Sequence, residues 1–402
     1  MKYVIVVPDG MADRPLKELG GRTPLEAAKT PNMDAVARGG ACGMAKTFYS
    51  GLPYDSSIAN MGILGYDPRK YFTGRSPLEA ANLGVVLEDG DLALRCNLIT
   101  VADGRIKDFT AGHISRQEGS ELIEALKERL GVAGLEFYPG VSYRNLLVIR
   151  KRLRPSDRIS TKPPHDIVGG LVSRNMVKAT SKRGEETARL LNRLIVDSAS
   201  VLEDHPVNGG RKARGKNVAN SVWFWGAGTR PDLPSFEEKF GMKGSLVSAV
   251  DLLKGIGKTI GLDVLDVKGA TGYIDTNYIG KADAALDSLK RVDFTYVHIE
   301  STDEAGHEGS IEHKIRAIED IDRNVVGEIL GRMGCDFRML LLPDHATPIE
   351  IRTHTKEPIP YAIYDSTKES VGACAFTERE IRKRSPKKAV ESYRLMGLLR
   401  GD

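Results

Sequence analysis

The sequence predicts an α/β protein: a mostly parallel sheet sandwiched by helices, with a smaller domain inserted into it. Short β-branched runs alternate with amphipathic helical patterns at both ends of the 402-residue chain, and this alternation is typical of parallel sheets covered by helices. The middle third has a different texture and breaks the alternation. We therefore expect a core formed by residues 1–90 and 215–402, and an inserted α/β (α+β) domain at 91–214.

The first elements follow from local residues. Residues 3–7 form a continuous β-branched run that ends just before Asp9, as expected for a strand buried on both faces. In parallel sheets, ligands gather at the carboxyl ends of the strands, so Asp9 lies where a site is expected. Pro31, in the segment Thr-Pro-Asn-Met-Asp, begins a helix because proline suits the first helical position.

Two adjacent hydroxyls, Ser56 and Ser57, precede an apolar helical pattern at 58–64. A hydroxyl at such a start can cap the helix, and the backbone N–H groups there can hold a phosphate. The sequence therefore offers a nucleophile beside an anion site. The alternative is that Asp55 or Ser56 only caps the helix, which is the better interpretation unless other chemistry lies nearby.

The remaining elements follow from the same two periodicities. In the inserted stretch we expect strands at 91–100 and 145–149, helices at 120–130 and 185–202, and a basic Gly-rich loop at 208–216. After residue 218 we expect strands at 222–225, 259–267, 293–300 and 337–342, and helices at 246–254, 278–289 and 310–333.

Composition narrows the class of protein. The chain carries 58 basic and 54 acidic residues, a mixed surface without the clustered basic excess of a nucleic-acid-binding protein. It opens directly on a strand, and no apolar run is long enough to span a membrane. We expect a cytoplasmic enzyme with a small-molecule substrate and no nucleic-acid or membrane partner, and the oligomeric state stays open. The four cysteines lie far apart and are interpreted as reduced thiols: Cys42, Cys96, Cys335 and Cys374.

Acidic and histidine side chains follow several of the predicted strands. They are Asp9, Asp303, His307, Asp344, His345 and His354. With Ser56, they are too many for one catalytic ion that keeps an open position, but they fit two ions that clamp the attacking and leaving oxygens of a phosphoryl transfer. Carboxylate and imidazole suit Mn, Zn or Co, and Mg when waters complete the shell. Taken singly, each residue is better explained as a turn, helix or loop residue, so the inference depends on the whole set.

Several segments resemble the alkaline phosphatase superfamily. Its recurring marks are Thr-Pro-Asn-Met-Asp at 30–34, Asp303 with His307, Asp344 with His345, and His354. Within it, the chain is similar to the archaeal type of cofactor-independent (2,3-bisphosphoglycerate-independent) phosphoglycerate mutase. The similarity lies in 56–68, TGRSPLEA at 73–80, 94–97, PPHDI at 163–167, HPVN at 205–208, GATGYIDTN at 269–277 and DEAGHEG at 303–309, which together span nearly the whole chain.

The resemblance implies an alkaline-phosphatase-like core and an isomerase activity. The reaction interconverts 3- and 2-phosphoglycerate in glycolysis and gluconeogenesis through a phosphoserine intermediate. It implies two divalent metal ions, Mn, Mg, Co or Zn, and no requirement for 2,3-bisphosphoglycerate. One ion is expected on Asp9, Ser56, Asp344 and His345, and the other on Asp303, His307 and His354, with Ser56 as the nucleophile.

Two positions depart from the family pattern. Ser57 stands where Asp or Glu is usual, and Gly62 stands where Ser or Asn is common. Both bear on the hydrogen bonds around the nucleophile. The first departure also makes Ser57 a minor rival to Ser56.

The inserted domain is expected to act as a lid that holds glycerate and excludes water. A carboxylate ligand favours arginine. By family position, the expected substrate-binding residues are His113, Arg144, His165, Asn208, Arg211 and Asn220 in the lid, and Lys268 in the core. His298, inside a strand, and His313, on a helix, are interpreted as structural. Three alternatives stay open: a phosphomonoesterase or phosphodiesterase on the same core, a relative that transfers phosphate on another compound such as a pentose or a phosphonate ester, and a non-catalytic metal-binding or scaffold protein.

Overall fold

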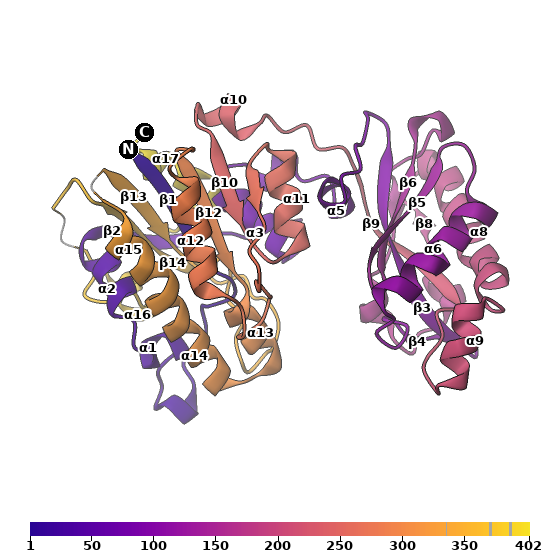
Figure 1. The fold of residues 1–402 in the computed structure, drawn as a ribbon, viewed down its shortest axis with the longest axis horizontal. Helices are drawn as coiled ribbons and strands as arrows, with labels where there is room; N and C mark the ends of the chain where they lie inside the picture. Colours follow the sequence, from indigo (N-terminus) through magenta and orange to yellow (C-terminus); the bar gives the residue numbers. More distant parts are fainter. Residues whose placement is uncertain (335, 370–371, 386–387) are drawn as a thin grey trace. The chain divides into compact units, whose positions relative to one another are not determined.

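The computed structural model describes residues 1–334, 336–369, 372–385 and 388–402. The chain divides into two compact units (Figure 1): unit 1 comprises Met1–Phe72 and Leu233–Asp402, and unit 2 comprises Thr73–Asp232. Unit 2 extends beyond the expected 91–214 at both ends. The reason is that α5 (Ser76–Asn82) packs against the sheet of unit 2, and β9 (Ser221–Thr229) belongs to that sheet.

Unit 1 is built on an eight-stranded sheet in the order β11-β10-β12-β1-β13-β14-β2-β15. At its centre, β1 (Lys2–Pro8) pairs in parallel with β12 (Phe294–Ile299) and with β13 (Phe337–Leu341). Among the described strands of this sheet, β14 alone runs antiparallel to its neighbours, so the expected mostly parallel sheet is confirmed. The other strands are β2 (Gly40–Lys46), β10 (Gly244–Val247), β11 (Asp263–Leu265), β14 (Ile359–Asp365) and β15 (Val390–Glu391).

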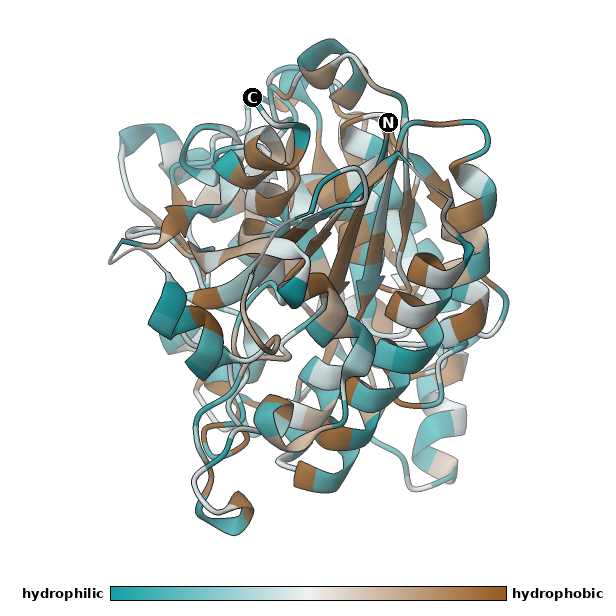
Figure 2. Cartoon of the chain, turned by 90° about the vertical axis from the view of Figure 1, so that its left-hand side faces the viewer, coloured by the Kyte–Doolittle hydropathy of each residue, from teal (hydrophilic) through white to brown (hydrophobic). Residues whose placement is uncertain are grey.

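Helices cover both faces of this sheet. On one face, α2, α12, α14 and α15 bury apolar side chains against the central strands. On the other face, α3 packs with α11, which contacts β10. Figure 2 shows the central strands as largely hydrophobic and the outer helical surfaces as richer in hydrophilic residues. The helices of unit 1 are α1 (Pro24–Ala27), α2 (Pro31–Arg38), α3 (Ser56–Ile63), α4 (Pro68–Tyr71), α10 (Phe236–Phe240), α11 (Asp251–Thr259), α12 (Tyr278–Ser288), α13 (Ser301–Glu308), α14 (Ile311–Ile321), α15 (Gly327–Arg332), α16 (Glu378–Arg384) and α17 (Leu395–Arg400).

Three expected elements of unit 1 differ from the structure. The helix expected at 246–254 is wrong, because 244–247 form β10 and the helix α11 begins only at Asp251. The short segment 244–247 is buried along its whole length, and periodicity alone cannot assign such a short buried segment. The strand expected at 259–267 is reduced to β11. The helix expected at 310–333 is observed as α14, a π-helical segment at Asp322–Val326, and α15.

Unit 2 contains an antiparallel five-stranded sheet. Its central strand, β3 (Leu92–Ala102), pairs with β6 (Arg144–Ile149) and β9, and the helices α6 (Arg116–Leu130) and α8 (Glu185–Leu202) contribute to the same core. The loop predicted at 208–216 is wrong for residues 208–213, which belong to the helix α9 (Pro206–Ala213). This helix begins with a proline in its first turn, a position that suits proline. The other elements are β4 (Arg105–Asp108), β5 (Leu135–Val141), β7 (Ile159–Ser160), β8 (Lys178–Ala179) and α7 (Val172–Asn175).

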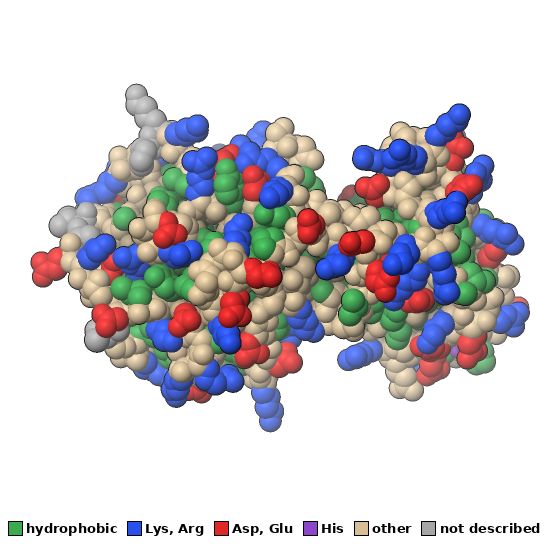
Figure 3. Space-filling view, turned by 90° about the horizontal axis from the view of Figure 1, so that it is seen from above, with side chains coloured by type: hydrophobic (Ala, Val, Ile, Leu, Met, Phe, Trp, Pro, Cys, Tyr) green, Lys and Arg blue, Asp and Glu red, His purple; other side chains and the backbone are tan. Residues whose placement is uncertain are grey.

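The surface carries both signs of charge. Figure 3 shows Lys and Arg side chains interspersed with Asp and Glu over the visible face of each unit. Within the described ranges, no helix combines the length and the apolar character that crossing a membrane requires. Cys42, Cys96 and Cys374 are free thiols, and Cys335 lies outside the described residues.

Candidate active site

The first group of expected ligands lies at the carboxyl ends of the central strands of unit 1. Asp9 follows β1, and Asp344 and His345 follow β13, its parallel neighbour. Ser56 is the first residue of α3. The Nε2 atom of His345 lies 3.2 Å from Ser56 Oγ and 3.2 Å from Asp9 Oδ1. It also lies 3.4 Å from Asp344 Oδ2, so the structure brings these side chains together.

The second group comes from α13 and the loop before β14. Asp303 and His307 lie on α13, directly after β12, and His307 Nε2 is 3.2 Å from Asp303 Oδ2. His354 Nε2 is 3.6 Å from Asp303 Oδ1 and 3.2 Å from His307 Nε2. The ring of His354 also stacks on that of His345, with centroids 3.9 Å apart. The two groups therefore adjoin, with His345 between them.

Three buried carboxylates meet at this edge of the sheet. Burial raises the pKa of Asp9 well above its usual range, and the neighbouring carboxylates of Asp344 and Asp303 raise it further. Burial also opposes the ionisation of Asp303, but hydrogen bonds with His307 and His354 hold its pKa well below the usual value. Such a concentration of negative charge away from water is stabilised by a cation.

The donor atoms fit a divalent cation. In each of two sets, the ligand atoms all lie within 4.8 Å of one another: Asp9 with His298 and Asp344, and Asp303 with His345 and His354. Among the described residues, neither Asp9 Oδ1 nor His298 Nε2 has a hydrogen-bond partner, although both atoms are buried. An unpaired polar atom in such a place is unfavourable, and a bound cation would provide its partner.

The start of α3 distinguishes the two serines. Asp55 is the N-cap, and its Oδ1 accepts hydrogen bonds from the N–H of Ser57 at 2.8 Å and from the Ser57 hydroxyl at 2.6 Å. Ser57 is fully buried, whereas Ser56 is partly exposed and faces His345. The cap is therefore Asp55, and Ser56 is the hydroxyl beside the ligand groups.

Contacts with neighbouring elements hold α3 in place. Asn60 Nδ2 donates to Asp344 Oδ2 at 2.7 Å, and Asn60 Oδ1 accepts a hydrogen bond from the Tyr296 hydroxyl. At Gly62, an added Cβ would lie 2.2 Å from the hydroxyl oxygen of Ser392. Ser392 therefore occupies the space that a larger residue at position 62 would need. This contact gives a physical reason for glycine at a position where the family often has Ser or Asn.

Two residues at this edge were missed by the sequence prediction. Thr347 donates a hydrogen bond from its hydroxyl to Asp303, and its oxygen lies 3.2 Å from Nδ1 of His345. His298, interpreted from the sequence as structural, lies beside Val7 in the register of β12 against β1. Its Nε2 is 3.0 Å from Asp9 Oδ2. Neither residue belongs to a recognisable motif, and only the tertiary fold brings them to the site.

Three of the expected substrate-binding residues have structural roles in unit 2. Arg211 is 1% exposed, and its guanidinium binds Glu118 at 2.7 Å and several backbone carbonyls. Asn208 is fully buried and joins α8 to the segment before β9 through backbone hydrogen bonds. Asn220 exchanges hydrogen bonds with the backbone of β3. These polar atoms hold unit 2 together, and substrate binding by the three residues stays a prediction.

An arginine cluster on the sheet of unit 2 was not expected. Arg95, on β3, is 6% exposed, and its guanidinium lies over the ring of Trp225, 4.5 Å from the centroid. Burial lowers the pKa of Arg95 to about 10; the carboxylate of Glu79, 3.0 Å from Arg95 Nε, opposes this shift, and the positive charges of Arg75 and Arg144 add to it. His165 packs edge-on against Trp225, with centroids 5.5 Å apart. Glu79 pairs with both Arg75 and Arg95, but with Arg144 the positive charges still outnumber this carboxylate, which favours an anionic ligand. The other expected binding residues are exposed: His113, Arg144, His165 and Lys268.

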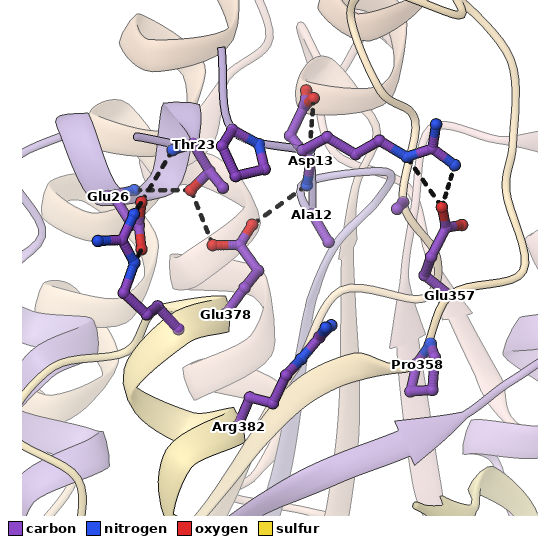
Figure 4. A pocket seen from close by; sticks show the side chains of 12 residues that line it. Ala12, Asp13, Thr23, Glu26, Glu357, Pro358, Glu378 and Arg382 are labelled. Carbon is purple, nitrogen blue, oxygen red and sulfur yellow. Dashed lines mark hydrogen bonds and ion pairs between the residues drawn. The ribbon is translucent and has the colours of Figure 1, made fainter. Parts of the chain in front are cut away.

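A separate pocket of about 400 Å³ lies in unit 1, and none of the expected ligands lines it (Figure 4). Its walls come from the loop after β1, the loop before β14, and α16. Glu378 lies between Thr23 and Asp13, accepting hydrogen bonds from the Thr23 hydroxyl at 2.8 Å and from the Asp13 N–H at 3.1 Å. Burial raises the pKa of Glu378 from 4.5 to about 7.

Glu378→Gln should therefore change how stability depends on pH. The folded protein retains the Glu378 proton up to higher pH than the unfolded chain does. The stability that this proton contributes is fully present below pH 4.5 and is lost as the pH rises through 7. The glutamine variant lacks this titration. As the pH rises from 4.5 to 8, its free energy of unfolding should therefore increase relative to that of the wild type by up to about 3 kcal/mol. Urea unfolding across this range measures the difference, and parallel pH profiles would contradict the burial argument.

Comparisons with known proteins cover the whole chain. The sequence profile of the family described as 2,3-bisphosphoglycerate-independent phosphoglycerate mutase matches residues 37–208. A protein of that name from Methanosarcina barkeri is 48% identical over 402 residues, covering 99% of each chain. A protein named as a probable member, from Geobacter sulfurreducens, is 48% identical over 389 residues, covering 95% of each chain.

Solved structures agree over the same length. A Pyrococcus horikoshii protein aligns with a TM-score of 0.84 at 30% identity, covering 100% of this chain and 96% of that one. The cofactor-independent phosphoglycerate mutase from Thermoplasma acidophilum aligns with a TM-score of 0.71 at 32% identity, covering 100% of this chain and 99% of that one.

Proposed function

The chain belongs to the 2,3-bisphosphoglycerate-independent phosphoglycerate mutases, and from this membership we propose how its residues carry out the reaction. It is an isomerase that interconverts 3- and 2-phosphoglycerate in glycolysis, and it requires no 2,3-bisphosphoglycerate. We propose that the phosphoryl group passes through Ser56, assisted by two divalent cations on unit 1. Family membership favours the mutase over the three alternatives: a hydrolase on the same core, a relative that transfers phosphate on another compound, and a non-catalytic protein.

The observation that carries this proposal is the position of one hydroxyl. Ser56 Oγ lies 3.2 Å from His345 Nε2, and His345 stands between two adjoining groups of carboxylates and histidines. A serine hydroxyl is a weak nucleophile at neutral pH unless a neighbouring group or a metal ion activates it. The arrangement therefore supports Ser56 as the phosphoryl acceptor.

We assign the two cations to the two ligand groups. The first has Asp9, Ser56, Asp344 and His345, and the second has Asp303, His307 and His354. Support comes from the unpaired oxygen of Asp9 and from the mutual repulsion of the buried carboxylates. Divalent cations, when bound, stabilise a serine alkoxide and the negative charge that develops on the transferred group. Ligands of this kind suit Mn, Co or Zn, and Mg when waters complete the shell.

The chain's own residues orient the reacting groups. Ser56 stands at the N-terminus of α3, where the positive end of the helix dipole favours a phosphate. Asn60 holds the Asp344 carboxylate in place from the same helix. In this mechanism Ser56 attacks the phosphorus of 3-phosphoglycerate, and glycerate departs. The second hydroxyl of glycerate then takes the phosphoryl group from the phosphoserine.

Glycerate has to stay bound between the two transfers. If water entered instead, the phosphoserine would be hydrolysed, and the enzyme would act as a phosphatase. We propose that unit 2 is the lid that prevents this loss. We assign the glycerate carboxylate to Arg95, Arg144 and His165, because guanidinium groups pair well with carboxylates. His113 and Lys268 stay further candidates for substrate binding.

Asp303→Asn should remove one of the two cations. Asparagine keeps the size of the side chain, but it lacks the negative charge that faces His307 and His354. After dialysis, elemental analysis should find about one divalent ion per chain instead of about two, and turnover should fall at least about 10³-fold. The matched control is Glu312→Gln, an exposed carboxylate on the following helix, which should leave both quantities unchanged. Equal metal content in the Asp303 variant and the wild type would refute the assignment.

A further inference from the structure

His298 is close to the first group of ligands but has no role in the mechanism described so far. Its side chain is 0% exposed and lies near the end of β12. Its Nε2 lies 3.0 Å from Asp9 Oδ2, yet among the described residues it has no partner in hydrogen-bonding geometry. Its ligand atom also lies within 4.8 Å of those of Asp9 and Asp344.

The histidines of this site share one orientation. Nδ1 of His307 and Nδ1 of His354 lie 2.9 and 3.1 Å from backbone carbonyls, and Nδ1 of His345 lies 3.2 Å from a threonine hydroxyl. In each case Nε2 is turned towards the carboxylates. His298 follows the same pattern, with Nδ1 3.4 Å from the Ser248 hydroxyl and Nε2 facing Asp9. Histidines that bind metals use this arrangement, in which the other ring N–H donates to an oxygen.

We propose that His298 is a ligand, through Nε2, of the cation assigned to Asp9 and Asp344. The inference rests on the proposed function, because it presumes that this cation binds. A purely structural His298 would leave a buried ring nitrogen without a partner, which is unfavourable. A role limited to orienting Asp9 would need a hydrogen bond from Nε2, and the 3.0 Å contact does not have that geometry.

The additional imidazole has a consequence for metal choice. With His345 and His298, the first site combines two imidazoles with two carboxylates and the Ser56 oxygen. Imidazole ligands suit Mn, Co and Zn better than Mg, which prefers oxygen ligands. His298 therefore biases this site against Mg. Removing it should weaken Co²⁺ binding at one site by about 100-fold and Mg²⁺ binding by a smaller factor.

The test counts the ligating histidines directly. In a Co²⁺-loaded protein, the ring N–H proton of each ligating histidine gives an exchangeable, strongly shifted proton NMR signal. Wild-type protein loaded with Co²⁺ should show signals for His307, His345 and His354 and a fourth for His298. His298→Asn should remove one signal and leave the other three. The matched control is His313→Asn, a histidine that pairs with Glu308 outside the site, and it should leave every shifted signal in place.

A second variant keeps the test independent of the folding of His298→Asn. Ser248→Ala removes the oxygen that faces Nδ1 of His298, so it should speed solvent exchange of the fourth signal only. Only three shifted N–H signals in fully loaded wild-type protein would overturn the ligand role of His298 and leave the proposed function standing. Failure of the wild-type protein to bind Co²⁺ at all would overturn the proposed cation sites as well.

Discussion

Ser56→Ala should abolish turnover while leaving the fold and the cation sites in place. The substitution removes the hydroxyl oxygen that faces His345. Alanine is a good helix former, and the N-cap of α3 is the neighbouring Asp55, so the helix should still form. The rate of conversion of 3- to 2-phosphoglycerate should fall by about 10⁴-fold or more, as expected when a nucleophile is lost. Metal content and the thermal midpoint, measured alongside, should stay close to wild type, because Asp9, Asp344 and His345 remain to hold the first cation.

The neighbouring serine supplies the matched control for this experiment. Ser57→Ala removes a buried hydroxyl that donates to Asp55, so it should cost about 1 kcal/mol of stability and retain turnover within about tenfold of wild type. Rapid quenching of the wild type with ³²P-labelled 3-phosphoglycerate should trap the label on the peptide that contains Ser56. Full activity in the Ser56→Ala variant, together with loss of activity in the Ser57→Ala variant, would identify Ser57 as the nucleophile instead.

The two groups of acidic and histidine side chains in unit 1 could be predicted because most of their members follow strands. Parallel strands end at one edge of a sheet, so Asp9 after β1 and Asp344 after β13 were expected at the same edge, and the pairing of these two strands makes them neighbours. The position of His298 could not be predicted in the same way. It depends on the register of β12 against β1, which pairs His298 with Val7, and register is a tertiary property that one strand's sequence does not contain.

The binding residues of unit 2 show a different limit. Arg211 and Asn208 were expected by family position to bind substrate, and in the structure their side chains bridge segments inside the unit. A buried polar side chain is hydrogen-bonded in either role, so residue type alone cannot separate the two. Arg95 was missed for the opposite reason: it lies within a strand, and its charge becomes significant only beside Arg75 and Arg144. Contact information was needed in both cases.

Lys314→Met should destabilise unit 1 strongly, although Lys314 touches no expected ligand. Its side chain is 0% exposed, and its Nζ lies 2.8 Å from Asp13 Oδ2 and donates to the Thr347 carbonyl at 2.8 Å. Methionine is an unbranched side chain only one atom shorter than lysine, but it leaves the buried Asp13 carboxylate without its counter-charge. Breaking such a pair costs about 3–5 kcal/mol in free energy of unfolding, which urea unfolding can measure. Because Thr347 also binds Asp303, cation affinity should fall in the same variant.

Two further variants decide whether charge or packing causes this loss. Arg316 lies on the same helix, but its side chain is 66% exposed. The Arg316→Met variant should therefore lose no more than about 0.5 kcal/mol in free energy of unfolding. Asp13→Asn combined with Lys314→Met removes both charges at once. If the unpaired carboxylate is the cause, the double variant should lose less stability than the sum of the two single variants, because no buried charge is left alone. If the two single losses simply add, the lysine acts through its packing and its backbone hydrogen bonds instead. The carbonyl of Thr347 would then be the point through which Lys314 supports the loop that carries His345.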